Sequence, residues 1–597
     1  MVTKGSVPAA SGSQASADPS IERARKRARI IWIITVFGLI SAGVQLFSIQ
    51  IVRGAELKEQ GRIVRTAASA IEGPRGSIVD SSGQILVDSV QTFHIAVNQR
   101  NILEYRHVED GVIVGTGPAE AARQLAPILE KDPSELGGLL LGDSTYSYLV
   151  KNLDAATTRQ IRKLGIHGIE WEPTYQRQYP AGDTALSVLG SVGVDGTGNA
   201  GLELQYDELL AGVPGEESYE IGPTGAVMPG AKVITKEASP GATLHLTLDS
   251  DLQYAVERDL GEAVATYGAT WGAAVVLDVA TSKVLALAGV NTQAGADGVD
   301  PVLATQMVYE PGSVGKVFTF AAALEAGTID PTTQFTIKDD VIVAGERFTD
   351  LGNYGTVERT ATGVLAQSSN TGTIQVGSTV TDEQRYDLLE RFGLGSPTGI
   401  ELPGESSGLL SPTSEWRGRT KYTTMFGQGY ALTAIQAAAA AAAIGNQGIY
   451  TPPRLVDGWT TTDGIFHEAE EVVPHQAIRP EVAKTLTSMM ESVVQDPEVG
   501  TGRLAAVDGY RVAAKTGSAE IGGGRVATSI IGIVPADDPQ IAISIVLYEV
   551  GDGFLAGTSA APLLSTLAAD ALRSQGISPS DEPAKLFASS PSAESAH

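Results

Sequence analysis

An uncharged run near the N-terminus sets the first limit on how this chain can fold. Residues 30–51 form a run of 22 residues with no Asp, Glu, Lys or Arg, and most of them are apolar. A helix rises 1.5 Å per residue, so this length spans the hydrocarbon core of a bilayer, which is ~30 Å thick. We therefore expect a single transmembrane anchor over residues 30–51.

The charges around this run predict its orientation. Residues 1–29 carry six basic and two acidic side chains, a net charge of +4, in a chain whose formal net charge is −27. Because basic flanks stay in the cytoplasm, we expect residues 1–29 to be a disordered cytoplasmic tail of a cell-membrane protein and the remainder to be extracytoplasmic. The alternative is a signal peptide cleaved near Ala68–Ala70, but several charged residues separate this segment from the apolar run.

Composition excludes several classes of protein. At 597 residues the chain is longer than one domain, and its acidic balance offers no basic surface for a nucleic acid. The absence of Cys excludes disulfides and thiolate metal sites. The seven His residues are scattered and predict no Ser-His-Asp triad. We predict no metal ion and no cofactor.

Gly and Pro punctuation divides the rest of the chain into three parts. Residues 52–239 are mixed in pattern and contain no catalytic cluster, which indicates a structural or partner-binding domain. Residues 240–575 carry strand patterns at both ends and mostly helical patterns between them, which predicts a mainly antiparallel sheet flanked by helices, with a helical insertion. Residues 576–597 are rich in Ser, Pro, Ala and Glu and predict a disordered tail.

The elements expected in the larger domain follow from its hydrophobic periodicity. One segment is almost all alanine and other apolar residues, so it should form a fully buried helix, Ala431–Ile444. The other expected helices are Asp249–Val264 and Ala560–Leu572, and the expected strands are Leu244–Leu248, Ala273–Leu277, Val284–Ala288, Ile530–Val534 and Ile541–Val550.

A Ser-x-x-Lys motif opens a helix in the insertion. Ser313 follows a Pro-Gly pair, and Gly327 ends the helical run. Positions i and i+3 share a helix face, so Ser313 and Lys316 should lie within hydrogen-bond reach. A buried lysine with a lowered pKa can take the serine proton and make the hydroxyl a nucleophile. Alone, the same pair would indicate a capping serine and a solvated lysine.

Two later motifs favour the catalytic interpretation. Ser368-Ser369-Asn370 offers a hydroxyl that can relay a proton and an amide that can hold both a lysine and a peptide carbonyl. Lys515-Thr516-Gly517-Ser518 is expected on an edge strand, where the charge and hydroxyl can bind a carboxylate and the glycine lets a peptide lie close. The first residues of the three motifs are 55 and 147 positions apart. Penicillin-binding proteins and class A β-lactamases carry a closely similar combination.

The chain resembles the class B penicillin-binding proteins over nearly its whole length after the tail. Among them it is most similar to septal, FtsI-type enzymes in an actinobacterial-like form. It departs from relatives at Ser369, where β-lactamases commonly have Asp, and at Ser518, where many relatives have Thr. Further similar stretches are Arg75–Asp80 with Gly83, Arg177–Pro180, Gly190, Gly201–Glu203 with Tyr206, and Phe426–Gly429 with Thr433 and Gln436.

This resemblance implies an α+β fold. The expected architecture is a transpeptidase domain of the penicillin-binding-protein and β-lactamase type at residues 240–575. It stands on an elongated N-terminal pedestal of the dimerisation type at residues 52–239, preceded by one transmembrane helix.

The resemblance also implies D,D-transpeptidation, the cross-linking of peptidoglycan stem peptides during cell division. Ser313 would attack the penultimate D-Ala carbonyl, and Lys316 would take its proton. The backbone N–H groups of Ser313 and Ser518 would hold the oxyanion. Ser368, with Lys316 and Lys515, would pass a proton to the leaving D-Ala. The substrate would be held by Asn370, Thr516, Gly517 and Ser518.

Partners and alternatives follow from the same resemblance. β-Lactams should acylate Ser313 and remain bound. An FtsW-type glycosyltransferase should contact the transmembrane helix and the pedestal, together with other divisome proteins. The alternatives are an elongation-type class B transpeptidase, a non-catalytic β-lactam-binding protein or divisome scaffold, and a D,D-carboxypeptidase or β-lactamase. The large pedestal and the anchor argue against the last two enzymes.

Overall fold

The computed structural model describes residues 19–220, 232–293, 302–551 and 553–591. The chain forms two compact units. The first consists of the chain up to Ile71 together with Gly215–Glu237, and the second of Glu72–Pro214 together with the chain from Ala238. This division differs in kind from the domain boundary that the sequence predicted at residue 239, which stays a prediction. The outermost parts of both predicted tails, residues 1–18 and 592–597, lie outside the described residues.

The first unit contains the apolar helix. Helix α1 (Pro19–Phe47) continues through a π-helical turn, η1 (Ser48–Val52), into α2 (Gly54–Arg65). Apart from Val36, which is partly exposed, the large apolar side chains from Ile30 to Val52 are 46 to 73% exposed, so no protein core covers them. Among the described residues, one helix, Glu22–Val52, is long and apolar enough to cross a membrane. The unit also has a three-stranded antiparallel sheet, β1 (Thr66–Ile71), β10 (Gly215–Glu220) and β11 (Val233–Lys236).

A five-stranded antiparallel sheet lies at the centre of the second unit. Its strand order is β14-β13-β25-β24-β23, which places the two ends of a long sequence segment side by side. Strands β13 and β14 match the predicted pair at 273–277 and 284–288, and β24 and β25 match those at 530–534 and 541–550. Their bounds are β13 Trp271–Asp278, β14 Val284–Asn291, β23 Ala513–Gly522, β24 Arg525–Val534 and β25 Ile541–Val550.

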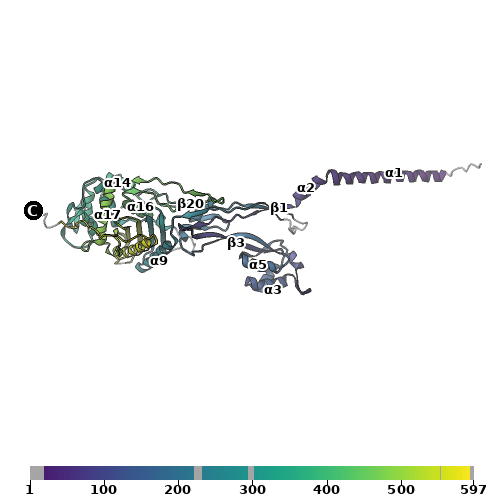
Figure 1. Ribbon diagram of the computed structural model, residues 1–597, viewed down its shortest axis with the longest axis horizontal. Helices are drawn as coiled ribbons and strands as arrows, with labels where there is room; N and C mark the ends of the chain where they lie inside the picture. Colours follow the sequence, from purple (N-terminus) through teal and green to yellow (C-terminus); the bar gives the residue numbers. More distant parts are fainter. Residues whose placement is uncertain (1–18, 221–231, 294–301, 552, 592–597) are drawn as a thin grey trace, which may run out of the picture. The chain divides into compact units, whose positions relative to one another are not determined.

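Helices cover both faces of this sheet, because its side chains alternate between two apolar cores. Val275 and Leu277 belong to one core, whereas Ala274 and Val276 belong to the other. The second core also contains side chains of α9 (Ser250–Tyr267) and α18 (Ala560–Ser574), which lie side by side (Figure 1). Helix α16 (Ala434–Gly445) packs in the first core, and its alanines are buried as the sequence predicted.

The helical insertion lies between β14 and β23 and carries the first two motifs. Its main helices are α11 (Lys316–Glu325), α12 (Ala361–Gln367), α13 (Asn370–Gly377), α14 (Asp382–Arg391) and α17 (Pro480–Gln495). Its shorter elements are α10 Leu303–Gln306, η3 Gly312–Gly315, β15 Gln334–Lys338, β16 Asp340–Val343, β17 Glu346–Thr349, β18 Thr356–Thr360, η4 Thr413–Glu415, α15 Thr420–Thr423, η5 Thr424–Phe426, β19 Ile449–Tyr450, β22 His475–Gln476 and η6 Arg503–Ala505.

A second sheet joins the N-terminal part of this unit to the C-terminal part. Strand β12 (Thr243–Leu246) pairs in parallel with β2 (Ile78–Val79) and antiparallel with β20 (Val456–Thr460). The remaining strands of this sheet are β3 Ile85–Val97, β6 Ser147–Asp154, β7 Ile169–Gln178 and β21 Phe466–Glu468. The sheet therefore crosses the boundary that the sequence predicted at residue 239.

A small separate core covers one end of β3. It is formed mainly by β3, β6 and three helices, α3 (Gly117–Leu129), α4 (Pro133–Leu140) and α5 (Ala155–Lys163). Pro127 lies inside α3, which ends two residues later at Leu129. The remaining elements are η2 Asn101–Glu104, β4 Arg106–Glu109, β5 Val112–Thr116, α6 Leu186–Leu189, β8 Ser191–Val192, β9 Gly198–Ala200, α7 Gly201–Gln205 and α8 Asp207–Leu210.

A buried ion-pair cluster ties three of the family-like stretches together. Glu203 has a fully buried side chain that accepts hydrogen bonds from Arg75 Nη2 and Arg177 Nε, both at 2.7 Å. Arg75 Nη1 also pairs with Asp207 at 2.6 Å. Glu203 therefore compensates the charges of both arginines, and Asp207 gives Arg75 a second carboxylate.

The C-terminal segment differs from the sequence prediction. Composition predicted a disordered tail from Gly576, whereas residues 577–591 are described and make defined contacts. Tyr510 donates to the carbonyl of Ile577, Phe587 packs on the first core, and Thr360 donates to Ala588. The physical reason is that two apolar side chains and several backbone carbonyls anchor a segment whose average composition is polar.

We expect Glu203→Ala to lower the free energy of unfolding by ~3–5 kcal/mol, because it removes the buried carboxylate that two guanidinium groups share and leaves Arg177 without its ion pair. Urea denaturation of the full-length chain in detergent measures this loss. The matched control is Glu135→Ala, which removes the carboxylate of an exposed pair with Lys131 at 3.7 Å. The control should change stability by less than about 1 kcal/mol. Equal losses in the two variants would contradict the role of the cluster.

Candidate functional site

The first motif lies in a tight turn. Ser313 is the second residue of the 3-10 turn η3, and α11 begins at Lys316, so the predicted helix starts one turn later than its serine. Gly312 has φ +53°, and a Cβ on it would lie 2.9 Å from the backbone of Ser518. A side chain at Gly315 would lie 2.4 Å from Gly427 Cα. The turn is therefore fixed between the edge strand β23 and the loop after η5.

Lys316 is completely buried, and its Nζ lies within hydrogen-bond distance of three oxygen atoms. Its Nζ lies 2.7 Å from Ser313 Oγ, 2.6 Å from the Ser368 carbonyl oxygen and 3.1 Å from Ser368 Oγ. The predicted contact between Ser313 and Lys316 is thus present, and the lysine also reaches the second motif.

Ser368 connects two lysines from distant parts of the chain. It is the C-terminal cap of α12 and has a left-handed backbone with φ +61°. Its Oγ lies 3.1 Å from Lys316 Nζ and 2.9 Å from Lys515 Nζ. A hydroxyl in this position accepts a hydrogen bond from one amine and can donate its own proton elsewhere.

The third motif lies on the edge strand β23, as the sequence predicted. Lys515 is completely buried and its Nζ also donates to the carbonyl of Thr516 at 2.9 Å. Thr516 Oγ1 is 3.1 Å from Thr501 Oγ1, and Ser518 Oγ accepts from the backbone N–H of Ala556 at 3.1 Å.

The structure gives a second reason for Gly517, beside the one that the sequence suggested. We expected the glycine to let a substrate approach the strand. In the structure a Cβ on Gly517 would lie 2.2 Å from the carbonyl oxygen of Pro311 and 2.6 Å from Ser529 Oγ. The absent side chain therefore makes room for the loop that leads into Ser313.

Burial controls the protonation of the two lysines. Desolvation lowers the pKa of Lys316 from its usual 10.5 to about 7, and the carboxylate of Asp350 partly opposes this shift. Burial and the neighbouring charge of Lys316 hold the pKa of Lys515 well below its usual 10.5. Near pH 7, a substantial fraction of Lys316 is therefore neutral and able to accept a proton.

Asn370 is held by its surroundings at the start of α13. Its Nδ2 donates to the carbonyl of Thr349 at 2.9 Å, and its backbone N–H donates to Asp350 Oδ1 at 2.6 Å. Within the described ranges no hydrogen bond joins its amide to Lys316, so the expected contact with a lysine is not made.

Sequence reasoning missed Asp350. Its Oδ1 accepts from the backbone N–H groups of Asn370 and Thr371, and its Oδ2 accepts from the hydroxyls of Ser369 and Tyr354. An anion at this helix N-terminus is favoured by the unpaired N–H groups there. The only sequence signal was indirect, because Ser369 stands where β-lactamases commonly have Asp. In the structure the loop after β17 places the carboxylate of Asp350 beside Ser369.

No metal centre accompanies this site in the part of the chain that the structure describes, because no group of three or more His, Cys, Asp or Glu residues converges there. Proton transfer and acyl transfer are the chemistry that a serine, two lysines and a second serine offer.

Two family models match the chain. "Penicillin binding protein transpeptidase domain" matches residues 272–569, and "Penicillin-binding Protein dimerisation domain" matches residues 70–246. The first match contains all three motifs, and the second contains the buried Arg75–Glu203–Arg177 cluster.

Similar proteins cover nearly the whole chain. It is 34% identical to penicillin-binding protein PbpB of Mycolicibacterium smegmatis over 91% of this chain and 90% of that protein. It is 30% identical to peptidoglycan D,D-transpeptidase FtsI of Escherichia coli over 89% of each. Together with the apolar helix Glu22–Val52, this likeness indicates a membrane-anchored protein.

Solved structures agree with these relatives. A peptidoglycan synthetase from Bifidobacterium adolescentis is 33% identical, with a TM-score of 0.70 over 88% of this chain and 100% of that one. Penicillin-binding protein 3 from Mycobacterium tuberculosis in complex with ampicillin is 28% identical, with a TM-score of 0.68 over 88% and 100%. The chain therefore belongs to the family of penicillin-binding proteins that combine a dimerisation domain with a transpeptidase domain.

Proposed function

We propose that this protein is a D,D-transpeptidase that cross-links peptidoglycan stem peptides during cell division. The observation that carries the proposal is the hydrogen-bonded series Ser313–Lys316–Ser368–Lys515, in which both lysines are completely buried. The names of relatives such as FtsI supply the substrate and the septal role, whereas the series supplies acyl transfer. The septal role is favoured over elongation and over a non-catalytic scaffold.

In the first half-reaction Ser313 is acylated. Neutral Lys316 accepts the hydroxyl proton while Ser313 Oγ bonds to the carbonyl carbon of the penultimate D-Ala. The tetrahedral intermediate then collapses and the C–N bond to the terminal D-Ala breaks. The leaving amine takes a proton through Ser368, which contacts both Lys316 and Lys515.

In the second half-reaction an amine from a neighbouring stem peptide attacks the acyl-enzyme. Its proton passes to the same lysine pair, the new amide bond forms and Ser313 is released with its proton restored. The acceptor must be a neutral amine, and the reaction exchanges one amide for another without net hydrolysis.

Backbone groups support the developing negative charge. The oxyanion hole consists of the N–H groups of Ser313 and Ser518, in keeping with the close packing of Gly312 against the Ser518 backbone. Thr516 binds the terminal carboxylate, Lys515 supplies positive charge beside it, and Asn370 holds the donor peptide. Gly517 and Ser518 complete the strand along which the substrate lies.

β-Lactams acylate the same serine and remain bound. The likeness to the ampicillin complex supports this assignment. Among the described residues no carboxylate makes a hydrogen bond to Ser313 or Lys316, so a hydrolytic water at these two groups has no carboxylate base attached to them. This favours a transpeptidase over a β-lactamase.

The anchor sets the location and the partners. The N-terminal tail lies in the cytoplasm and the catalytic domain lies outside, because six basic residues precede the apolar helix. An FtsW-type glycosyltransferase contacts the transmembrane helix and the pedestal and supplies nascent glycan, with other divisome proteins around it. The domain boundaries at 52–239 and 240–575 belong to the same proposal.

We expect Ser313→Ala to abolish covalent labelling of the full-length chain by a fluorescent penicillin, whereas the label on the wild type persists. Ser368→Ala should retain the nucleophile but slow acylation by roughly 10²–10⁴-fold, since it removes the proton relay. The matched control is Ser414→Ala, an exposed serine, which should label like the wild type. Label that is lost within seconds from the wild type would indicate a β-lactamase instead.

The acylation rate should rise between about pH 5 and about pH 8 with its midpoint near the pKa of Lys316, about 7. The sign follows from the role of Lys316, which accepts a proton only when neutral and is protonated below its pKa. Stopped-flow acylation across this range measures the profile, and a midpoint near 10.5 would show an unperturbed lysine.

Replacing residues 30–51 by an unrelated apolar helix of equal length should abolish recruitment to the septum while β-lactam acylation of the membrane fraction is retained. The reason is that the proposed glycosyltransferase contact uses the specific helix surface. Fluorescence microscopy of tagged chains measures recruitment. Normal septal localisation of the replaced chain would exclude a specific helix contact.

A further inference from the structure

The last described residues of the chain run back across the catalytic domain. After α18 the backbone N–H of Ile577 donates to Leu572 at 2.9 Å, and Tyr510 OH donates to the carbonyl of Ile577 at 2.7 Å. These contacts fix the point at which the segment leaves the helix. We call residues 578–591 the C-terminal strap.

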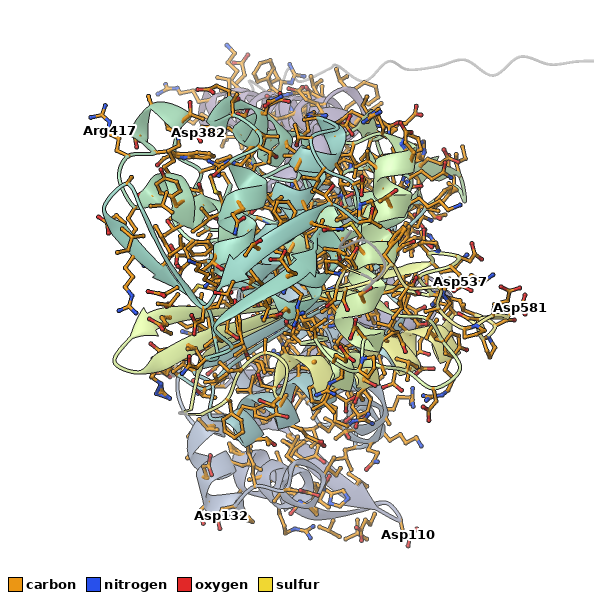
Figure 2. All side chains as sticks on the ribbon, turned by 90° about the vertical axis from the view of Figure 1, so that its left-hand side faces the viewer. Asp110, Asp132, Asp382, Arg417, Asp537 and Asp581 are labelled. Atoms are coloured by element: carbon orange, nitrogen blue, oxygen red, sulfur yellow. The ribbon has the colours of Figure 1, made fainter. Side chains whose placement is uncertain are left out.

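The first part of the strap is held by Ser580. Its backbone N–H donates to Gly509 at 2.9 Å, and its Oγ accepts from the backbone N–H of Arg511 at 3.0 Å and donates to Asp537 at 2.7 Å. Figure 2 shows Asp537 and the neighbouring Asp581 close together at the right-hand edge of the unit. The strap thus crosses the loops before β23 and between β24 and β25.

The second part of the strap meets the start of α12. The side chain of Phe587 packs against the first core. The hydroxyl and the backbone N–H of Thr360, the N-terminal cap of α12, donate to the carbonyls of Ala588 at 2.5 Å and Ser589 at 3.1 Å. Arg359 Nη1 donates to Ser590 Oγ at 2.9 Å.

A glycine permits this close approach. A Cβ built on Gly363 would lie 1.9 Å from the carbonyl oxygen of Ser589. Gly363 lies in a helix, where alanine is intrinsically more stable. The close approach of the Ser589 carbonyl explains why glycine is found there instead.

Helix α12 connects the strap to the second motif. The helix has only seven residues, and Ser368 is its C-terminal cap. Arg359, which binds the strap, also donates through Nε to the side chain of Gln367 at 2.8 Å, next to Ser368. A helix this short is not stable by itself, so its position depends on tertiary contacts: α17 packs along the buried helix, and the strap meets its N-terminal end.

We propose that the C-terminal strap is a positioning element for Ser368, acting through Thr360, Arg359 and helix α12. The strap satisfies the cap of α12 and sets the rotamer of the Thr360 hydroxyl, whose proton goes to Ala588 while its oxygen accepts from Gly363. Ser368 is thereby held at hydrogen-bond distance from both lysines. The inference rests on the proposed function of Ser368 as the proton relay.

The test compares full-length wild type, a chain that ends at Ile577, and Gly363→Ala in the otherwise complete chain. A fluorescent penicillin gives two quantities separately: the dissociation constant of the non-covalent complex and the maximal acylation rate. Because a displacement of about 1 Å at a reacting group costs up to about 10²-fold in rate, both variants should acylate about ten to a hundredfold more slowly. Their dissociation constants should stay unchanged.

Two controls separate positioning from general destabilisation. Gly261→Ala places the same methyl group in the middle of α9, where nothing lies within 4 Å, and should acylate like the wild type. A synthetic peptide of residues 578–591 added to the shortened chain should restore its rate. Unchanged acylation in Gly363→Ala, or an equal loss in Gly261→Ala, would overturn the inference even where the shortened chain failed to fold.

Labelling of Ser313 tests the proposed function, and hydrogen exchange of α12 tests the role of the strap independently. A wild type that takes no label at Ser313 would contradict the proposed function. Amide hydrogen exchange of residues 361–368 would then still decide on the strap, with faster exchange in Gly363→Ala supporting it and unchanged exchange overturning it.

Discussion

Two buried ammonium groups that share one hydroxyl are the constraint on which the rest of the structure depends. Lys316 and Lys515 come from a helix and an edge strand, and Ser368 Oγ lies within 3.1 Å of both. Like charges in a desolvated site repel, so it is unfavourable for both lysines to be protonated at once near neutral pH. Such a pair loses its protons in two steps, and the apparent pKa of each step belongs to the pair and not to one lysine. The fold supplies the rigidity that this arrangement needs.

That rigidity comes from close backbone packing. Gly312, Gly315 and Gly517 each lie against a neighbouring backbone at distances that leave no space for a side chain. The serine turn is therefore held directly between β23 and the loop after η5, and no flexible side chain separates them. A nucleophile and its base held by backbone contacts keep their geometry when the substrate arrives, which lowers the reorganisation that the reaction requires.

Much of the fold and part of the site could be predicted from sequence, because they follow from hydrophobic periodicity and from the order and spacing of the motifs. The central strands, α9, α16 and the serine–lysine contact all have local patterns, such as the apolar runs of β13 and the i, i+3 spacing of Ser313 and Lys316. Asp350 could not be found in this way, because it lies in a loop without periodicity and acts through tertiary contacts with Ser369 and Asn370. Ile577 and Phe587 were hidden by the polar average around them, and the reason for Gly517 depends on Pro311, far away in sequence.

The sheet that joins β2, β12 and β20 has a consequence for the order in which the protein can fold. Ribosomes make chains from the N-terminus, so residues 78–79 are complete long before Thr243–Leu246 and Val456–Thr460, their neighbours in the sheet. Such long-range pairing is slow, and strand edges that wait for a partner are prone to pair with other chains. The N-terminal part therefore cannot complete its own sheet until Val456–Thr460 has been made, and this sheet must form late in synthesis or after it.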